Sequence, residues 1–202
     1  DELGDLTIEI ILDKKKKTIT ISDKGIGMSA DEIKKYINQI AFSGATEFIE
    51  KYKDKDDSSQ IIGHFGLGFY SAFMVSKYVE IKSKSYIKKN KPAYWKCDGN
   101  TEFEIKSSDK KERGTDVILH INDDSKDFLE ENKIEDILKK YCRFLPVENK
   151  FGKKEKSIED GKDKEGKPKY KSIKEDNIIN NPNPIWTKSP KDLKDEDYKE
   201  FY

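Results

Sequence analysis

The sequence predicts an α+β sandwich, and the order of its secondary-structure signals carries that prediction. β-branched residues alternate with polar ones at 6–12 and at 18–22, which is typical of strands. Helical spacing follows in the next segment, and several strand-like segments follow the helix between residues 78 and 121. The order of strands, helix and further strands favours the α+β class.

The first two strands read as a hairpin, because residues 6–12 and 18–22 are joined by a lysine-rich turn. The second strand leads directly into the glycine-containing turn at 23–28. Ser29 stands three residues before Glu32, which is the signature of a capping box, and apolar residues keep helical spacing from there to residue 41. We therefore expect a glycine turn that joins a strand end to a helix start.

The central part of the chain predicts a flap, a glycine loop and a set of strands. Residues 43–60 break the helical pattern and read as a mobile flap with one short helix. Residues 61–70 form a glycine-rich loop that opens a buried helix at 71–75. The further expected strands lie at 78–83, 93–97, 102–105 and 115–121.

The last third predicts a helix, a charged segment and the beginning of another domain. Residues 128–144 carry apolar side chains at helical intervals, and Pro146 stops that pattern. Residues 150–176 consist mainly of Lys, Glu, Asp and Gly, which indicates a solvated linker or a mobile hairpin. Aromatic residues return from residue 178 onward, as expected where a new domain starts.

Composition excludes several classes of protein. The 202 residues include 40 Lys+Arg and 40 Asp+Glu, and this balance argues against a nucleic-acid binder. Acidic residues interleave with the lysines of the charged segment, so a linker is favoured there over a nucleic-acid tail. No apolar run is long enough for a membrane helix. Cys97 and Cys142 stand far apart, which fits a reduced, cytoplasmic protein, and the chain starts at Asp1 as if it had lost its natural start.

Three glycine-containing motifs are candidates for a binding site. Glycines at 63, 66 and 68 ahead of an apolar helix form a plausible phosphate cradle, and a tight turn explains them equally well. Asp23 precedes Gly25 and Gly27, so its carboxylate can accept a hydrogen bond from an exocyclic amine, although an Asx turn gives the same pattern. Thr115 stands at the start of an apolar strand. Either its hydroxyl contacts a ligand, or the residue only marks where the strand begins.

The order of these motifs resembles the three downstream boxes of the GHKL ATP-binding superfamily. Ile40-Ala41-Phe42-Ser43-Gly44, the glycine loop from Ile62 to Ser71, and Pro184-Ile185-Trp186-Thr187 are similar to strings of the Hsp90 family in particular. The resemblance implies the Bergerat fold, a mainly antiparallel sheet covered by helices on one face. It also implies an ATP-binding domain at 1–149, a charged linker at 150–177 and the beginning of a middle domain at 178–202.

The resemblance also implies roles for individual residues. Asp23 would bond the adenine amino group, with Thr115 supporting the base through water, while Gly27 and Met28 would wall the ring. Residues 43–60 would close over bound ATP as a lid, and Gly63 through Phe69 would wrap the phosphates with backbone amides. The full expected set of nucleotide-binding residues is Asp23, Gly27, Met28, Tyr36, Phe42, Ser43, Gly44, Gly63, His64, Phe65, Gly66, Leu67, Gly68, Phe69 and Thr115.

This sequence departs from the family pattern in ways that affect hydrolysis. Family members carry an earlier helix with a Glu that activates water and an Asn that helps hold Mg²⁺, and the present sequence begins after both. We therefore expect no catalytic or metal-binding residue in this chain and weak hydrolysis by it. Phe42 replaces the usual lid lysine, His64 stands where Gln is common, and Tyr36 where Asn is common.

The expected function is that of the nucleotide-binding module of an ATP-dependent Hsp90-type chaperone. ATP or ADP, with Mg²⁺ in the longer protein, would drive lid closure and clamp dimerisation, and the partners would be client proteins and a second copy rather than nucleic acid or membrane. Two alternatives remain open. One is another GHKL ATPase, of the sensor-kinase or topoisomerase type, and the other is a nucleotide-free module for protein interactions.

Overall fold

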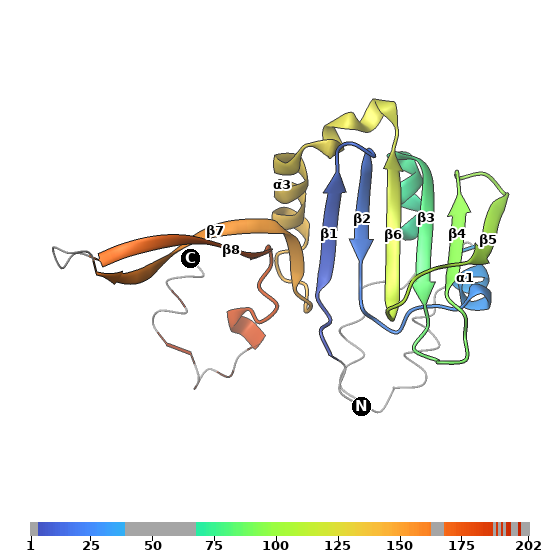
Figure 1. The fold of residues 1–202 in the computed structure, drawn as a ribbon. Helices are drawn as coiled ribbons and strands as arrows, with labels where there is room; N and C mark the ends of the chain where they lie inside the picture. Colours follow the sequence, from blue (N-terminus) through green and yellow to red (C-terminus); the bar gives the residue numbers. More distant parts are fainter. Residues whose placement is uncertain are drawn as a thin grey trace.

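The computed structural model describes residues 4–38, 68–162 and 168–187, together with residues 189, 191, 193, 194 and 198. In that part of the chain the strands form one sheet, in the order β5-β4-β3-β6-β2-β1-β7-β8 (Figure 1). All neighbouring strands are antiparallel except β1 and β7, which run parallel. The strands are β1 (Ile8–Asp13), β2 (Thr18–Ser22), β3 (Ser76–Lys84), β4 (Ala93–Cys97), β5 (Phe103–Ser107), β6 (Gly114–Ile121), β7 (Asn149–Lys162) and β8 (Pro168–Ile178).

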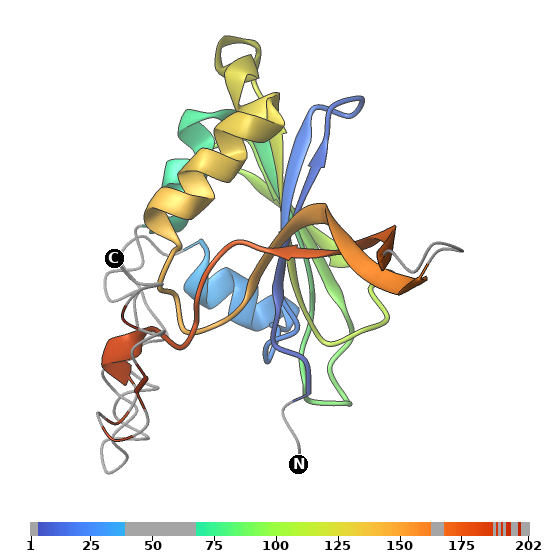
Figure 2. The same ribbon diagram turned by 90° about the vertical axis from the view of Figure 1, so that its left-hand side faces the viewer.

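The helices lie on one face of the sheet, as the second view shows (Figure 2). They are α1 (Ala30–Tyr36), the 3₁₀ helix η2 (Gly68–Met74), the 3₁₀ helix η3 (Asp123–Leu129) and α3 (Glu131–Tyr141), with a further 3₁₀ turn, η4 (Ile185–Thr187), near the end of the described chain. This arrangement confirms the predicted α+β sandwich with a mainly antiparallel sheet.

The core between helices and sheet has two parts. One buried cluster joins β1, β2 and β6 to the segment of η3 and α3, with Ile10, Ile121 and Ile134 among its members. The other joins α1 to β3 and β4 around Ile33, Ile81 and Trp95. Because the strands alternate, the inward side chains of β3 and β6 meet these clusters and the outward ones face away from the helices.

The start of α1 confirms the predicted capping box. The Ser29 hydroxyl accepts the N–H of Glu32 at 3.4 Å, and the Glu32 carboxylate accepts the N–H of Ser29 at 2.7 Å. These bonds satisfy two donors that a helix start leaves without partners. They also fix the point at which the chain leaves the glycine turn at 23–28, so the cap helps to hold the site described below.

Two predicted helices differ from the observed ones. The segment after the glycine loop is the 3₁₀ helix η2 rather than a buried α-helix, and Met74 at its end is 80% exposed. The predicted helix at 128–144 begins earlier, as η3, and continues as α3, which ends at Tyr141. Cys142 caps that helix and donates its N–H to the carbonyl of Leu138, so the end comes before Pro146.

The charged segment is a hairpin, one of the two alternatives that its composition left open. β7 and β8 pair antiparallel over most of their length and extend beyond the edge of the sheet (Figure 1). The base of the hairpin is joined to the sheet by parallel pairing of Ile8–Ile10 with Asn149–Phe151. Phe151 is buried in the first core cluster, so the base of the hairpin packs with the core instead of lying in solvent.

The face of the sheet opposite the helices carries a polar cluster at its centre. Glu80 on β3 accepts a hydrogen bond from the Tyr94 hydroxyl at 2.6 Å, and its other oxygen lies 3.0 Å from His120 Nε2. Burial alone would raise the pKa of Glu80, but the bonds from Tyr94 and His120 outweigh it and hold the pKa below its ordinary value.

None of the helices in the described part of the chain is long and apolar enough to cross a bilayer.

Candidate functional site

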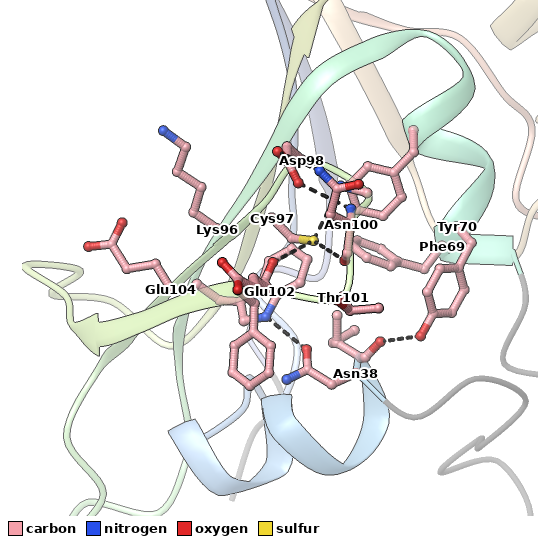
Figure 3. A pocket seen from close by; sticks show the side chains of 15 residues that line it. Asn38, Phe69, Tyr70, Lys96, Cys97, Asp98, Asn100, Thr101, Glu102 and Glu104 are labelled. Atoms are coloured by element: carbon pink, nitrogen blue, oxygen red, sulfur yellow. Dashed lines mark hydrogen bonds between the residues drawn. The ribbon is translucent and has the colours of Figure 1, made fainter.

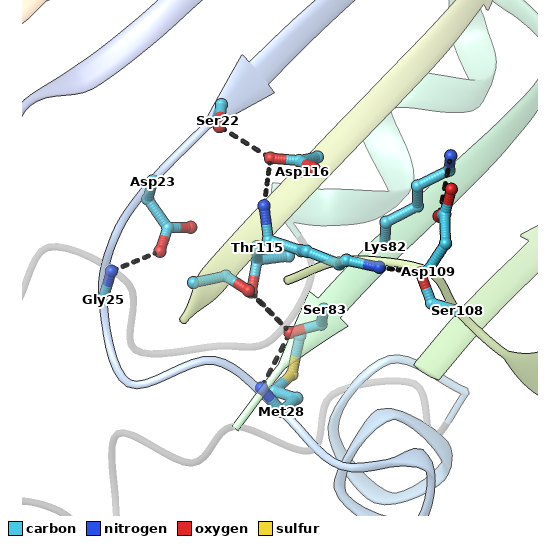
Figure 4. Close-up of polar contacts among 12 residues, drawn as sticks. Ser22, Asp23, Gly25, Met28, Lys82, Ser83, Ser108, Asp109, Thr115 and Asp116 are labelled. Carbon is cyan, nitrogen blue, oxygen red and sulfur yellow. Dashed lines mark hydrogen bonds and ion pairs between the residues drawn. The ribbon is translucent and has the colours of Figure 1, made fainter. Parts of the chain in front are cut away.

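The structure brings Asp23 and Thr115 side by side at one end of the sheet. Asp23 follows β2 directly and Thr115 is the second residue of β6. Their backbones exchange two hydrogen bonds, from Asp23 N to Thr115 O at 2.9 Å and from Thr115 N to Asp23 O at 3.2 Å. Both residues continue the inward alternation of their strands, so their side chains belong to the face that the helices cover (Figure 4).

The Asp23 side chain closes an Asx turn and keeps one oxygen available. Its Oδ1 accepts the N–H of Gly25 at 2.7 Å. Among the described residues, none donates a hydrogen bond to its Oδ2. The turn alternative and the binding role are therefore compatible, because the turn uses one carboxylate oxygen and orients the other. A half-buried carboxylate of this kind can accept a hydrogen bond from a ligand amine.

Glycine is required at position 27 for two separate reasons. Its φ is +61°, in the left-handed region, and a β-carbon there would overlap the carbonyl oxygen of Lys84. The loop is held against β3 on both sides of this glycine. The Ile26 carbonyl accepts the N–H of Tyr86 at 2.8 Å, and the Met28 N–H donates to Ser83 Oγ at 2.7 Å. The loop therefore approaches the sheet closely, with Met28 packed against the second core cluster.

Ser83 is a residue of this site that the sequence did not indicate. It is fully buried on β3, opposite Thr115 in the β3–β6 register. Its Oγ lies 2.8 Å from Thr115 Oγ1 and 3.3 Å from the Gly114 carbonyl oxygen, in addition to its bond with Met28 (Figure 4). One hydroxyl thus connects the glycine turn to β6. A serine in an alternating strand carries no local signal of such a role, because the register that creates it is non-local.

The other described members of the expected set lie on the helices. Tyr36 is the last residue of α1, with the Lys35 ammonium 5.0 Å from its ring centre. Gly68 is the exposed first residue of η2. Phe69 makes edge contacts with Phe73 and Trp95, at 5.9 and 5.7 Å between ring centres, so it packs in the core. Phe42, Ser43, Gly44, Gly63, His64, Phe65, Gly66 and Leu67, with the lid at 43–60, lie outside the described residues.

A large cavity lies beside β4 and β5 (Figure 3). Its volume is about 1080 Å³, and its lining includes Phe69, Phe73, Trp95 and Cys97. Asp23, Gly27 and Thr115 are absent from its lining. We place the candidate site at the Asp23–Thr115 pair nonetheless, because the closely approaching glycine turn and the oriented carboxylate occur there. The cavity is mainly an opening beside an aromatic cluster.

The described residues offer no metal site. No group of three or more His, Cys, Asp or Glu side chains in that part of the chain is placed to hold a metal ion. What they do offer is one carboxylate oxygen, one hydroxyl pair and a glycine turn, all at the same end of the central strands of the sheet. This combination suits a flat, hydrogen-bonding ring better than a phosphate or a cation.

Comparison with known proteins agrees with this geometry. Residues 5–118, more than half of the chain, match the family described as histidine kinase-, DNA gyrase B- and HSP90-like ATPases. The chain belongs to this ATPase family. A second match, to the family described as Hsp90 protein, covers residues 146–202. The first match spans Asp23, Gly27, Ser83 and Thr115, so the residues that meet at the site all fall in the ATPase domain.

Individual relatives place the chain near the Hsp90-type chaperones. It is 59% identical over 201 residues to chaperone protein HtpG of Bacteroides thetaiotaomicron, and the alignment covers 100% of this chain and 28% of that protein. HtpG of Porphyromonas gingivalis is 51% identical with the same two coverages. HtpG of Sulfurimonas denitrificans is 41% identical over 96% of this chain and 31% of its own length. The chain thus spans less than a third of the length of these curated relatives, and within its family it is Hsp90-like and similar to HtpG.

Proposed function

We propose that this chain is the adenine-nucleotide-binding module of an ATP-dependent chaperone of the HtpG type. The observation that carries the proposal is the pairing of Asp23 with Thr115 beside a glycine turn, inside a domain that belongs to an ATPase family. The relatives at 51% and 59% identity bear the name chaperone protein HtpG, which supports the chaperone role of the longer protein.

In this proposal Asp23 anchors the base. Its Oδ1 is held by the Gly25 N–H, so Oδ2 is oriented to accept a hydrogen from the adenine amino group. Thr115 supplies a hydroxyl next to the carboxylate, and Gly27 with Met28 lets the turn approach the ring. The loop from Gly63 to Phe69, His64 included, is proposed to wrap the phosphates, and Tyr36, Phe42, Ser43 and Gly44 are proposed to contact the nucleotide as well. Phe69 would then serve both the core and the site.

Hydrolysis and metal binding are assigned to the longer protein. The proposed Mg²⁺ accompanies the phosphates there, held with help from the Asn that the Hsp90 family carries on its earlier helix. Nucleotide binding and hydrolysis are proposed to drive lid closure over residues 43–60 and association of two copies, which act on client proteins in the cytoplasm. By itself the present chain is proposed to hydrolyse ATP weakly.

Isothermal titration with ADP, with and without Mg²⁺, tests the proposal. It is run on this chain and on a form extended at its N-terminus by the helix that the Hsp90 family carries there. Binding by both forms means that the Asp23 side of the pocket is sufficient for the base. Binding by the extended form alone means that the added helix completes the site. Absence of binding in both forms contradicts the proposal and favours the nucleotide-free interaction module.

A further inference from the structure

We propose that Ser83 is a specificity-determining residue of the nucleotide site, which sets the direction of the Thr115 hydroxyl and thereby favours adenine over a 6-oxopurine. This inference rests on the proposed function. The observation behind it is that Ser83, with no exposed surface, places its Oγ within 3.3 Å of three groups of the site, the Met28 N–H, the Thr115 hydroxyl and the Gly114 carbonyl. A residue that contacts the site only through Thr115 and the Met28 turn acts by positioning.

Counting hydrogens on the two hydroxyls leaves two arrangements. Each hydroxyl has one hydrogen to donate and two lone pairs, and Ser83 Oγ uses one lone pair for the Met28 N–H. Either Ser83 donates to Thr115 Oγ1, at 2.8 Å, or it donates to the Gly114 carbonyl, at 3.3 Å, and accepts from Thr115. Both arrangements keep the 2.8 Å contact between the two hydroxyls, so only the Ser83–Gly114 contact distinguishes them. At 3.3 Å that contact is longer than the roughly 2.5 to 3.0 Å of O–H···O hydrogen bonds, which favours the first arrangement.

The first arrangement leaves the Thr115 hydrogen free for a ligand. The site then presents an acceptor, Asp23 Oδ2, next to a donor, the Thr115 hydroxyl. The adenine edge presents the reverse order, a donor at its amino group and an acceptor at N1, so the two edges match. A 6-oxopurine has an acceptor at position 6 and a donor at N1. In this site its O6 would face the Asp23 carboxylate, acceptor against acceptor, and its N1–H would face the Thr115 hydroxyl hydrogen, donor against donor.

A water bound between Thr115 and Asp23 would transmit the same preference. Such a water gives one of its two hydrogens to the carboxylate. When Thr115 donates to it, the second hydrogen stays available for adenine N1. When Thr115 only accepts, the second hydrogen goes to Thr115 and the water can offer only a lone pair, which suits the N1–H of a 6-oxopurine. The direction of the Ser83–Thr115 bond therefore decides selectivity in both cases.

The test compares ADP with inosine diphosphate, because the two differ only at the 6-position and N1. Affinities are measured by competition titration in whichever form, the chain or its extended version, binds ADP. Ser83→Ala is expected to lower the ratio of ADP affinity to inosine diphosphate affinity about tenfold, the effect of losing one oriented hydrogen bond. Ser83→Cys keeps a side chain of similar size with a weak hydrogen-bond donor, so its affinity ratio is expected to lie between those of the wild type and Ser83→Ala. Ser85→Ala, at another buried serine one residue beyond the end of β3, is the matched control and is expected to keep the ratio.

A double-mutant cycle with Thr115→Val separates positioning from a general loss of structure. If Ser83 acts through Thr115, adding Ser83→Ala to Thr115→Val changes the affinity ratio less than twofold. A Ser83→Ala variant that lowers both affinities equally, or that keeps the wild-type ratio, overturns the inference and leaves the proposed function intact. A wild-type protein that binds neither nucleotide in either form refutes the proposed function and the inference with it.

Discussion

Asn180 fixes the base of the charged hairpin, and replacing it is expected to release the hairpin from the sheet. Asn180 is 8% exposed and follows β8. Its Oδ1 accepts the N–H of Asn149 at 2.7 Å, and its Nδ2 donates to the carbonyls of Leu145 and Val147, both at 2.8 Å. These bonds tie the end of the hairpin to the turn that follows α3.

Asn180→Ala removes three hydrogen bonds and leaves the Asn149 N–H without its acceptor. At about 1 kcal/mol for each bond, the junction is expected to lose roughly 3 kcal/mol of stability. The loss is local, because β7 pairs with β1 through only a short stretch beginning at Ile8 and Asn149. Opening of the junction is therefore expected to become about 100-fold more frequent.

Amide hydrogen exchange at Ile179 measures that opening. Its N–H donates to the Asn149 carbonyl at 2.8 Å and is not itself bonded to the replaced side chain. Asn181→Ala is the control, because the exposed Asn181 side chain accepts only the N–H of Asn183. Exchange at Ile179 within threefold of the wild type in Asn180→Ala would refute the reasoning that this side chain anchors the hairpin.

Three further predictions concern the site and the open face of the sheet. Gly27→Ala is expected to lower the free energy of unfolding, measured in urea, by about 2 kcal/mol or more. The Gly27 backbone is left-handed, and a β-carbon there would overlap the carbonyl oxygen of Lys84. An unchanged urea midpoint would contradict the close approach of the turn to β3. Asp23→Asn is expected to lower ADP affinity at least tenfold. The asparagine has a single side-chain oxygen, which can accept from the Gly25 N–H or from the ligand but not from both. Asp116→Asn, on the opposite face of the sheet, is the control and is expected to keep the ADP affinity. Tyr94→Phe is expected to raise the pKa of Glu80, measured by carboxyl NMR titration, because a donor to the ionised form is lost; an unchanged or lower pKa would be inconsistent with that bond. Since the folded pKa of Glu80 is depressed, its ionisation stabilises the fold above the ordinary value of 4.5, and that contribution is lost as the pH falls through the folded pKa.

Local patterns were sufficient to predict much of the fold. The bounds of β2 and β4 agree with the strands expected at 18–22 and 93–97, because alternation and turn residues are properties of neighbouring positions. The capping box before α1 was equally visible, since both of its partners lie within one turn. Asp23, Gly27 and Thr115 were predicted as site residues from the order of their motifs, and the structure brings Asp23 and Thr115 together where the central strands β2 and β6 meet at one end of the sheet.

What the sequence could not indicate depends on non-local pairing. Ser83 joins the site only because β3 and β6 set it opposite Thr115. The charged segment has few apolar residues, so its composition favoured a linker, whereas its parallel pairing with β1 depends on a partner about 140 positions earlier in the chain. The helix expected after the glycine loop is a 3₁₀ helix whose Phe69 and Phe73 rings reach the core, a conformation that apolar spacing alone does not distinguish from an α-helix.

The most direct measurement for the nucleotide site is amide chemical-shift mapping by NMR during titration with ADP. The account predicts that the largest shifts occur at residues 23–28 and at Gly114 and Thr115, and that Asp23→Asn abolishes them at the same ADP concentration. Shifts concentrated instead around Trp95 and Cys97 would assign the ligand to the large cavity beside β4 and would contradict the Asp23–Thr115 site.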